Sequence, residues 1–353
     1  MLLAYTATGA SVAGGFVNYA NVLLLQVTGH TVSPTGLAVL CVVVSTLIAY
    51  RDVQVSARLM LVTEAVSVAL IAIVLTLLLV HNGPHVDTSQ LRLQGVTTAG
   101  VRLGVVLALF SFVGFESATT LGTEAANPLR TIPRAVVQSA LLSGLFFILC
   151  AYLETLGMHA LHQNLGESTA PMHALSTLAG VGVFGTLIDV GALVSMFAAT
   201  LACITAASRV MLRMAHNGLI HDSLARTHHR NATPHTAVLL IGLATALPVA
   251  ALTMRGASGA DIYAWLGSLA VYGFITVYGL AAVALPFSLK RRQGLTAATL
   301  VLAIAAALAM LLALAGTLYP VPDRPYNWLP YLYLGYILGG MAWLFVRRGR
   351  QTV

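Results

Sequence analysis

The sequence predicts an all-α integral membrane protein with about ten transmembrane helices. Three observations support this class. Of the 353 residues, 58% are hydrophobic and 8% are charged, whereas a soluble domain carries about 25% charged residues. The apolar residues gather in runs of roughly the 17–25 residues that a helix needs to cross a bilayer. The basic residues gather at alternate ends of these runs, as they do in multi-pass proteins.

Ten apolar runs are expected to form these helices, and polar, turn-rich segments separate them. The runs cover residues 2–27, 34–50, 57–80, 102–123, 136–158, 181–208, 236–254, 261–287, 295–318 and 328–346. No long polar segment indicates a soluble domain, so we expect a single transmembrane domain over residues 1–353.

The distribution of basic residues predicts how the chain is oriented. All but four of the 18 basic residues lie at one set of run ends, and the exceptions are Arg92, Arg102, Arg255 and Arg324. The positive-inside rule places the larger set, and both chain ends, in the cytoplasm. We therefore expect a multi-pass protein of the cell membrane. Orientation also accounts for the net charge of +7, so nucleic-acid binding is not expected.

Enzymatic and metal-binding alternatives have little support in the sequence. His159 and His162 are spaced to share one helical face, and Glu167 and His173 lie nearby, but no HExxH motif is present. A membrane metalloenzyme around these residues is a third hypothesis, behind the two given below. We expect no enzymatic activity, no bound metal and no cofactor.

The most informative stretch covers residues 109–134, where the fourth apolar run contains the carboxylate Glu116. A charged side chain at membrane depth costs at least ~2.5 kcal/mol, so it marks a site or a buried pair by default. Gly114, two residues earlier, allows the backbone to leave helical geometry and approach a ligand. A helix broken at this depth is tolerated where its freed backbone groups line a cavity. The stretch therefore predicts a site on a broken helix.

The same stretch resembles the sixth transmembrane helix of amino-acid permeases of the amino acid–polyamine–organocation superfamily. The family pattern is roughly Phe-x-Gly-Phe-Glu, a further acid, and Asn-Pro-x-Arg-x-Ile-Pro-Arg. The matching residues are Phe112, Gly114, Phe115, Glu116, Glu124, Asn127, Pro128, Arg130, Ile132, Pro133 and Arg134. Residues 206–234 resemble the cytoplasmic end of the family's eighth helix and the start of its ninth. There the matches are Ser208, Arg209, Met214, Ala215, Gly218, Thr233 and Pro234, while His216 and Asn217 replace the usual Arg-Asp.

The resemblance implies the leucine-transporter type of fold, in which two inverted five-helix repeats hold the site between the broken first and sixth helices. With the fourth run as the family's sixth helix, the first run is its third, and the family's first two helices are absent. We thus expect an incomplete version of the fold. Residues 1–80 would be a remnant of the first repeat, 102–287 the second repeat, and 295–347 two C-terminal helices. Amino-acid binding by these residues alone is expected to be weak or absent.

The resemblance also implies which residues form the site. The exposed backbone from Ser111 to Phe115 would contact a substrate's amino or carboxyl group, and Glu116 would take up a proton or hold a gate pair. Phe110 would cover the site as an aromatic lid, although a core position suits this residue equally well. The substrate-binding candidates are Phe110, Ser111, Phe112, Val113, Gly114, Phe115, Asn18 and Thr200.

Two polar residues outside this stretch have two interpretations each. Glu64, grouped with Glu116 as a proton or gating candidate, is expected to be an interfacial acid or a partner of Arg58 or Arg209. Alternatively, it occupies the cation position of this fold. Thr200 lines the cavity in one interpretation. In the other, its hydroxyl bonds to the carbonyl four residues earlier, as hydroxyls in membrane helices usually do.

Together these features predict a secondary active transporter (a permease) for amino acids or related amines, with the proton as the candidate coupling ion. The alternative is a non-transporting truncated membrane protein or a scaffold for other helices. The expected partners are an amino acid or amine and the lipid bilayer, and the sequence leaves the oligomeric state open.

Overall fold

The computed structural model describes most of the chain. It covers residues 1–51, 57–82, 90, 92, 96–116, 119, 127–162, 165, 168–227, 233–292, 294–319 and 321–351. Within these ranges the regular structure is helical, and no strand forms.

Each predicted apolar run contains one helix of the described chain. The helices are α1 (Leu2–Thr28), α2 (Pro34–Arg51), α3 (Ala57–Asn82), α4 (Thr98–Phe112), α5 (Pro128–Ala160), α7 (Gly182–His216), α8 (His235–Met254), α9 (Gly259–Arg291), α10 (Ala297–Leu318) and α11 (Leu329–Gln351). Among the residues that the structure describes, nine helices are long and apolar enough to cross a membrane, and α4 is shorter. The predicted all-α, multi-pass class is therefore confirmed.

Two helical features differ from the apolar runs. α5 begins at Pro128 rather than at the predicted residue 136, because proline is favoured at the first helical position, where its missing N–H has no partner to lose. α6 (Pro171–Leu178) is a short helix in a segment that we expected to be a loop, and it also opens on a proline. Both helices therefore start at a local backbone signal, which hydropathy does not record.

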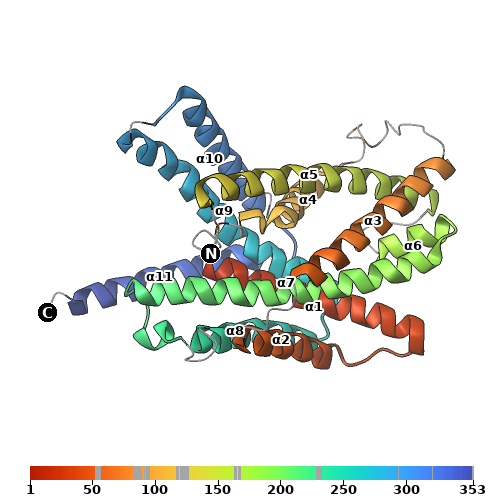
Figure 1. Ribbon diagram of the computed structural model, residues 1–353, viewed down its shortest axis with the longest axis horizontal. Coiled ribbons are helices and arrows are strands. Elements are labelled where there is room, and N and C mark those ends of the chain that lie inside the picture. Colours follow the sequence, from red (N-terminus) through yellow and green to blue (C-terminus); the bar gives the residue numbers. More distant parts are fainter. Residues whose placement is uncertain are drawn as a thin grey trace.

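Helix α1 lies at the centre of the bundle, beside α7 and α9 (Figure 1). Small residues bring the backbones of α1 and α9 together. A Cβ added at Gly14 would lie 3.0 Å from the Gly259 carbonyl oxygen, and one at Gly259 would lie 2.7 Å from the Asn18 amide nitrogen. Close packing of this kind holds helices together in a bilayer. The larger buried cluster forms around these helices and includes Ile204 of α7 and Ile262 of α9.

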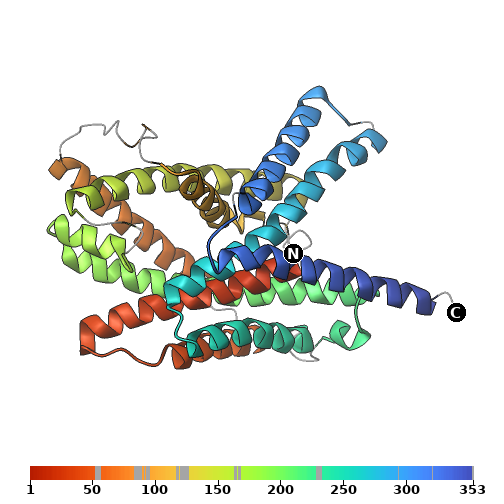
Figure 2. The same cartoon turned by 180° about the vertical axis from the view of Figure 1, so that it is seen from behind.

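Helices α3, α5 and α6 form a second group beside α7, and the α9–α10 hairpin extends away from this group (Figure 2). The core of the second group contains Leu75 of α3, Leu153 of α5 and Leu175 of α6. Helix α4 contacts α5, α9 and α10, so its end lies where the two parts of the bundle meet. The division of the chain into a first-repeat remnant and a second repeat stays a prediction.

Candidate functional site

Helix α4 ends inside the fourth apolar run, which continues to residue 123 in the sequence. Thr97 caps the start of the helix by accepting a hydrogen bond from the Gly100 amide. At the other end Val113 is extended, with φ −62° and ψ 137°. Gly114 follows with φ 111°, a value that glycine adopts without the steric cost that a side chain would add. The helix thus ends before Glu116, and residues 113–116, which follow it, are called the interrupted segment below.

The carboxylate of Glu116 is held by three hydrogen-bond donors from three parts of the chain. The Tyr5 hydroxyl of α1 donates to Oε1 at 2.9 Å, and the Tyr278 hydroxyl of α9 donates to Oε2 at 2.7 Å. The Gly114 amide also donates to Oε2, at 3.1 Å. The side chain is only 8% exposed. Glu116 therefore joins the interrupted segment to both helices at the centre of the bundle.

Aromatic rings surround these hydrogen bonds. The ring centroid of Tyr278 lies 5.5 Å from that of Phe115 and 5.8 Å from that of Phe274. Tyr5 meets Phe274 edge-on, with centroids 5.7 Å apart. Hydrogen bonds are electrostatically stronger in such low-dielectric surroundings than in water. The rings therefore strengthen the contact of Glu116 with α1 and α9.

The predicted substrate-binding segment lines a cavity of about 390 Å³. Residues from Ser111 to Phe115 form one wall, and Ala135, Ser139 and Ser143 of α5 contribute to the other. The Phe110 carbonyl accepts from the Val113 amide at 3.1 Å, but the last carbonyls of a helix generally lack intrahelical partners and carry the negative end of the helix dipole. This wall can therefore receive a cationic group such as an ammonium.

Two aromatic candidates of the segment pack against neighbouring helices. Phe110 is 6% exposed, meets Tyr263 edge-on with centroids 5.5 Å apart, and rests on Gly267, where a Cβ would lie 2.7 Å from its ring. Phe112 meets Phe147 of α5 edge-on at 5.5 Å. The structure places Phe110 in the core contact that the sequence left open, and its role as a lid stays a prediction.

Asn18 and Thr200 do not line the cavity beside Gly114. The Asn18 amide group donates to the Thr169 carbonyl at 3.0 Å and lines a different cavity. Thr200 is fully buried, and its hydroxyl donates to the Met196 carbonyl at 2.9 Å. This is the local bond that a hydroxyl in a membrane helix usually makes.

Glu64 connects α3 to α7, because its Oε2 accepts a hydrogen bond from the Ser195 hydroxyl at 2.9 Å. The side chain of Arg58, one of its two predicted partners, lies outside the described residues, as do Glu124 of the permease motif and Glu167 of the candidate metal group. In the described part of the chain, no group of three or more His, Cys, Asp or Glu side chains could hold a metal ion.

Of the two tyrosines that hold Glu116, Tyr5 was not among the predicted site residues, and Tyr278 had only a weak claim, as a polar side chain in the eighth apolar run. Tyr5 and Tyr278 lie 111 and 162 residues away from Glu116 in the sequence. Each sits in an apolar run, where tyrosine is commonly an interfacial anchor. A polar group within an apolar run was the available signal, but only the packing of α1 and α9 shows that both hydroxyls reach one carboxylate.

Comparison with known proteins identifies the family. A family model described as "Amino acid permease" matches residues 1–342. An uncharacterized transporter of Mycobacterium tuberculosis is 32% identical over 230 residues, which are 64% of this chain and 50% of the relative. The branched-chain amino acid permease BcaP of Lactococcus lactis is 25% identical over 267 residues, 73% of this chain and 54% of the relative.

BcaP of Bacillus subtilis is 28% identical over 148 residues, 42% of this chain and 31% of the relative. The chain thus spans about half the length, or less, of the curated relatives it matches. The family match nevertheless extends over nearly the whole chain, and the chain belongs to the amino acid permease family.

Proposed function

We propose that this chain acts in a secondary transporter that moves amino acids or related amines across the cytoplasmic membrane, with a proton taken up at Glu116. One observation carries the proposal. The interrupted end of α4 opens onto a cavity, and directly beside it a buried carboxylate is hydrogen-bonded to α1 and α9. Broken helices with free backbone ends at membrane depth are the common binding device of secondary transporters.

The substrate's ammonium group would bind at the carbonyl end of α4. Ser111 to Phe115 line the cavity there, and the helix dipole favours a positive charge at a C-terminal end. Ser143 of α5 faces the same cavity and supplies a hydroxyl group for the substrate's carboxylate, and Ser139 could do so by giving up its bond to the Val136 carbonyl. The apolar Ala135 leaves room for a side chain.

Proton uptake would change the contacts that Glu116 makes. All three of its partners are donors, so both oxygens act as acceptors. A proton on one oxygen occupies an accepting position and turns that oxygen into a donor. The proton also removes the negative charge that makes the three hydrogen bonds strong, so the bonds from Tyr5 and Tyr278 weaken and the segment is held less firmly to α1 and α9. Protonation is thereby coupled to movement of the wall that contacts the substrate.

The relatives suggest which substrates to examine first. Two of them carry the name branched-chain amino acid permease, so leucine, isoleucine and valine are the first compounds to try. The purified chain is expected to bind leucine saturably and weakly. In proteoliposomes, uptake of labelled leucine should rise when the lumen is made alkaline relative to the outside.

The control variant is Glu116→Gln, which retains the shape of the side chain and removes its titration. Folded, monodisperse protein that shows neither saturable binding nor uptake of any amino acid or amine would contradict the proposal. That result would favour the alternative, a non-transporting membrane scaffold.

A further inference from the structure

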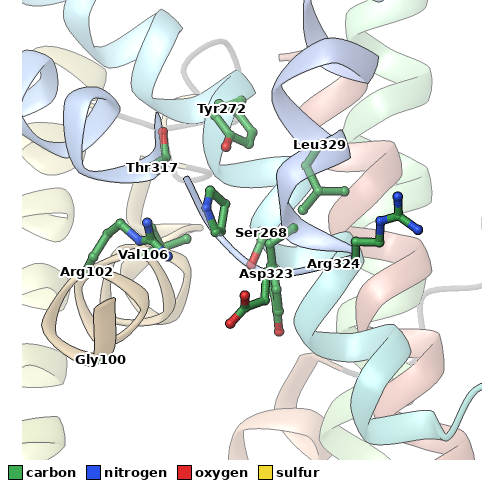
Figure 3. A pocket seen from close by; sticks show the side chains of 11 residues that line it. Gly100, Arg102, Val106, Ser268, Tyr272, Thr317, Asp323, Arg324 and Leu329 are labelled. Carbon is green, nitrogen blue, oxygen red and sulfur yellow. The ribbon is translucent and has the colours of Figure 1, made fainter. Parts of the chain in front are cut away.

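A second cavity, of about 250 Å³, lies between α4 and α9, beside the end of α10 and the start of α11 (Figure 3). Arg102 of α4, Ser268 of α9 and Leu329 of α11 contribute to its lining. None of its lining residues lines the cavity beside Gly114. The two cavities are therefore separate candidate sites.

Arg102 brings a positive charge to this second cavity, which the carboxylate of Asp323 also lines. Its Nη1 atom is buried and has no hydrogen-bond partner. The ion pair found within the described residues joins His173 and Asp189, and Arg102 takes no part in it. A guanidinium has five N–H donors and keeps its charge, and a buried charge without a partner is unfavourable. Arg102 is also one of the four basic residues that depart from the positive-inside pattern. Among the described residues Asp323 forms no ion pair with Arg102, so both features indicate room for a further anionic partner.

Ser268 supplies a second free donor on the other side of the cavity. The residue is 3% exposed, and its hydroxyl has no hydrogen-bond partner. Hydroxyls in membrane helices usually bond to the carbonyl four residues earlier, as Thr276 of the same helix does with the Tyr272 carbonyl at 2.8 Å. Ser268 makes no such bond. Its O–H is therefore free to donate to a molecule in the cavity.

The rest of the lining defines the shape of the ligand. Val106 and Leu329 are 7% and 6% exposed and add apolar surface to the lining, whereas Asp323 adds a carboxylate. In Figure 3 the Arg102 side chain extends from α4 toward the part of α9 that carries Ser268, while Arg324 points away from both. A ligand with oxygen acceptors at one end and an apolar part beside them matches this arrangement.

We propose that this cavity binds an oxyanion, a carboxylate or a phosphate, with Arg102 and Ser268 as its hydrogen-bond donors. Guanidinium groups recognise both kinds of oxyanion through paired N–H donors. The volume is just below the roughly 300–1,000 Å³ of pockets for drug-sized ligands, and it suits a small group. Two sources can supply that group: the carboxylate of a free amino acid, or the phosphate of a lipid headgroup at the membrane surface.

The test uses the purified chain in detergent with two pairs of probes. Leucine is compared with 3-methylbutylamine, which lacks the carboxylate, and phosphatidylglycerol is compared with diacylglycerol, which lacks the phosphate. Native mass spectrometry counts the molecules bound to each chain over a concentration series. The parent should bind leucine or phosphatidylglycerol more tightly than the matched probe without the oxyanion, and the preferred pair identifies the source.

The variants separate this cavity from other anion contacts. Arg102→Gln should weaken binding of the preferred probe by at least about tenfold, since hydrogen bonds to charged groups are worth that much. Ser268→Ala should weaken it several-fold, and it alters the fold least because it removes one hydroxyl. Arg255→Gln, a change of the same charge at an exposed position beyond α8, should bind as the parent does.

Two results would overturn the proposal. One is a parent protein that binds neither oxyanion probe more tightly than its matched compound. The other is a folded Ser268→Ala variant that binds the preferred probe with the affinity of the parent. This result counts whether or not the Arg102→Gln variant folds. Transport by the cavity beside Gly114 is measured separately, so failure here leaves that function unaffected.

Discussion

Replacing Tyr278 with phenylalanine tests whether Glu116 holds the central helices together. The substitution removes one hydroxyl, whose oxygen lies 2.7 Å from Oε2 of Glu116, and leaves the ring contacts with Phe115 and Phe274 in place. Glu116 retains two donors, the Tyr5 hydroxyl and the Gly114 amide. The experiment therefore isolates a single contact between α9 and the interrupted segment.

The magnitude follows from the charge and the burial of the acceptor. A hydrogen bond to a charged group contributes about 1.5–3 kcal/mol, and one between neutral groups about 0.5–1.5 kcal/mol. Because Glu116 is buried among aromatic rings, Tyr278→Phe should lower the free energy of unfolding by about 1.5–3 kcal/mol. The loss should shrink in a Glu116→Gln background, because residues in one hydrogen-bond network couple by roughly 0.5–3 kcal/mol.

Unfolding of the four proteins of this double-mutant cycle can be followed by circular dichroism in mixed micelles with increasing denaturant. Tyr331→Phe serves as the matched control, because that tyrosine is 71% exposed on α11, and exposed substitutions stay within about 0.5 kcal/mol. Equal losses from Tyr278→Phe in both backgrounds, or a loss no larger than that of the control, would refute the reasoning.

Three further predictions test packing, the second polar contact and orientation. Gly14→Ala should destabilise the protein by about 1–3 kcal/mol in thermal melts, because its Cβ would come within 2.7 Å of a side chain on α9. The control is Gly104→Ala, whose Cβ would meet nothing within 4 Å, so this change should be neutral or slightly stabilising. Asp189→Asn should cost about 1.5–3 kcal/mol in the same assay, since this 1% exposed carboxylate lies 3.0 Å from a histidine of α6; unchanged stability would show that the pair is not formed. An impermeant thiol reagent should label His30→Cys only from outside the cell and Arg292→Cys only from the cytoplasm, and labelling of both from one side would contradict the orientation.

The number and position of the helices could be predicted from the sequence, because bilayer thickness fixes the length of an apolar run. The run predicted at 236–254 is α8, which begins at His235 and ends at Met254. Helix ends follow local backbone signals, which hydropathy does not detect. The run predicted at 181–208 continues as α7 to His216, and it ends just before Gly218, whose φ is 69°, as helices commonly end at a glycine.

The site could be predicted only in its local part. Gly114 and Glu116 are two residues apart, so the interruption of α4 and the position of the acid follow from one short stretch. The contacts of Glu116 with Tyr5 and Tyr278 depend on how α1 and α9 pack across the bundle. Asn18 and Thr200 were chosen by their polarity within apolar runs, and polarity does not specify which way a helix face points.

The pH dependence of leucine uptake by Glu116→Gln tests the central claim most directly. Uptake into proteoliposomes is measured over a range of external pH for the parent and the variant, with thermal stability of both measured in detergent. The account predicts that the variant loses much of the pH dependence while its affinity for leucine changes less, because the amide keeps the shape of the side chain and cannot titrate. An unchanged pH profile at unchanged stability would contradict the role of Glu116 in coupling.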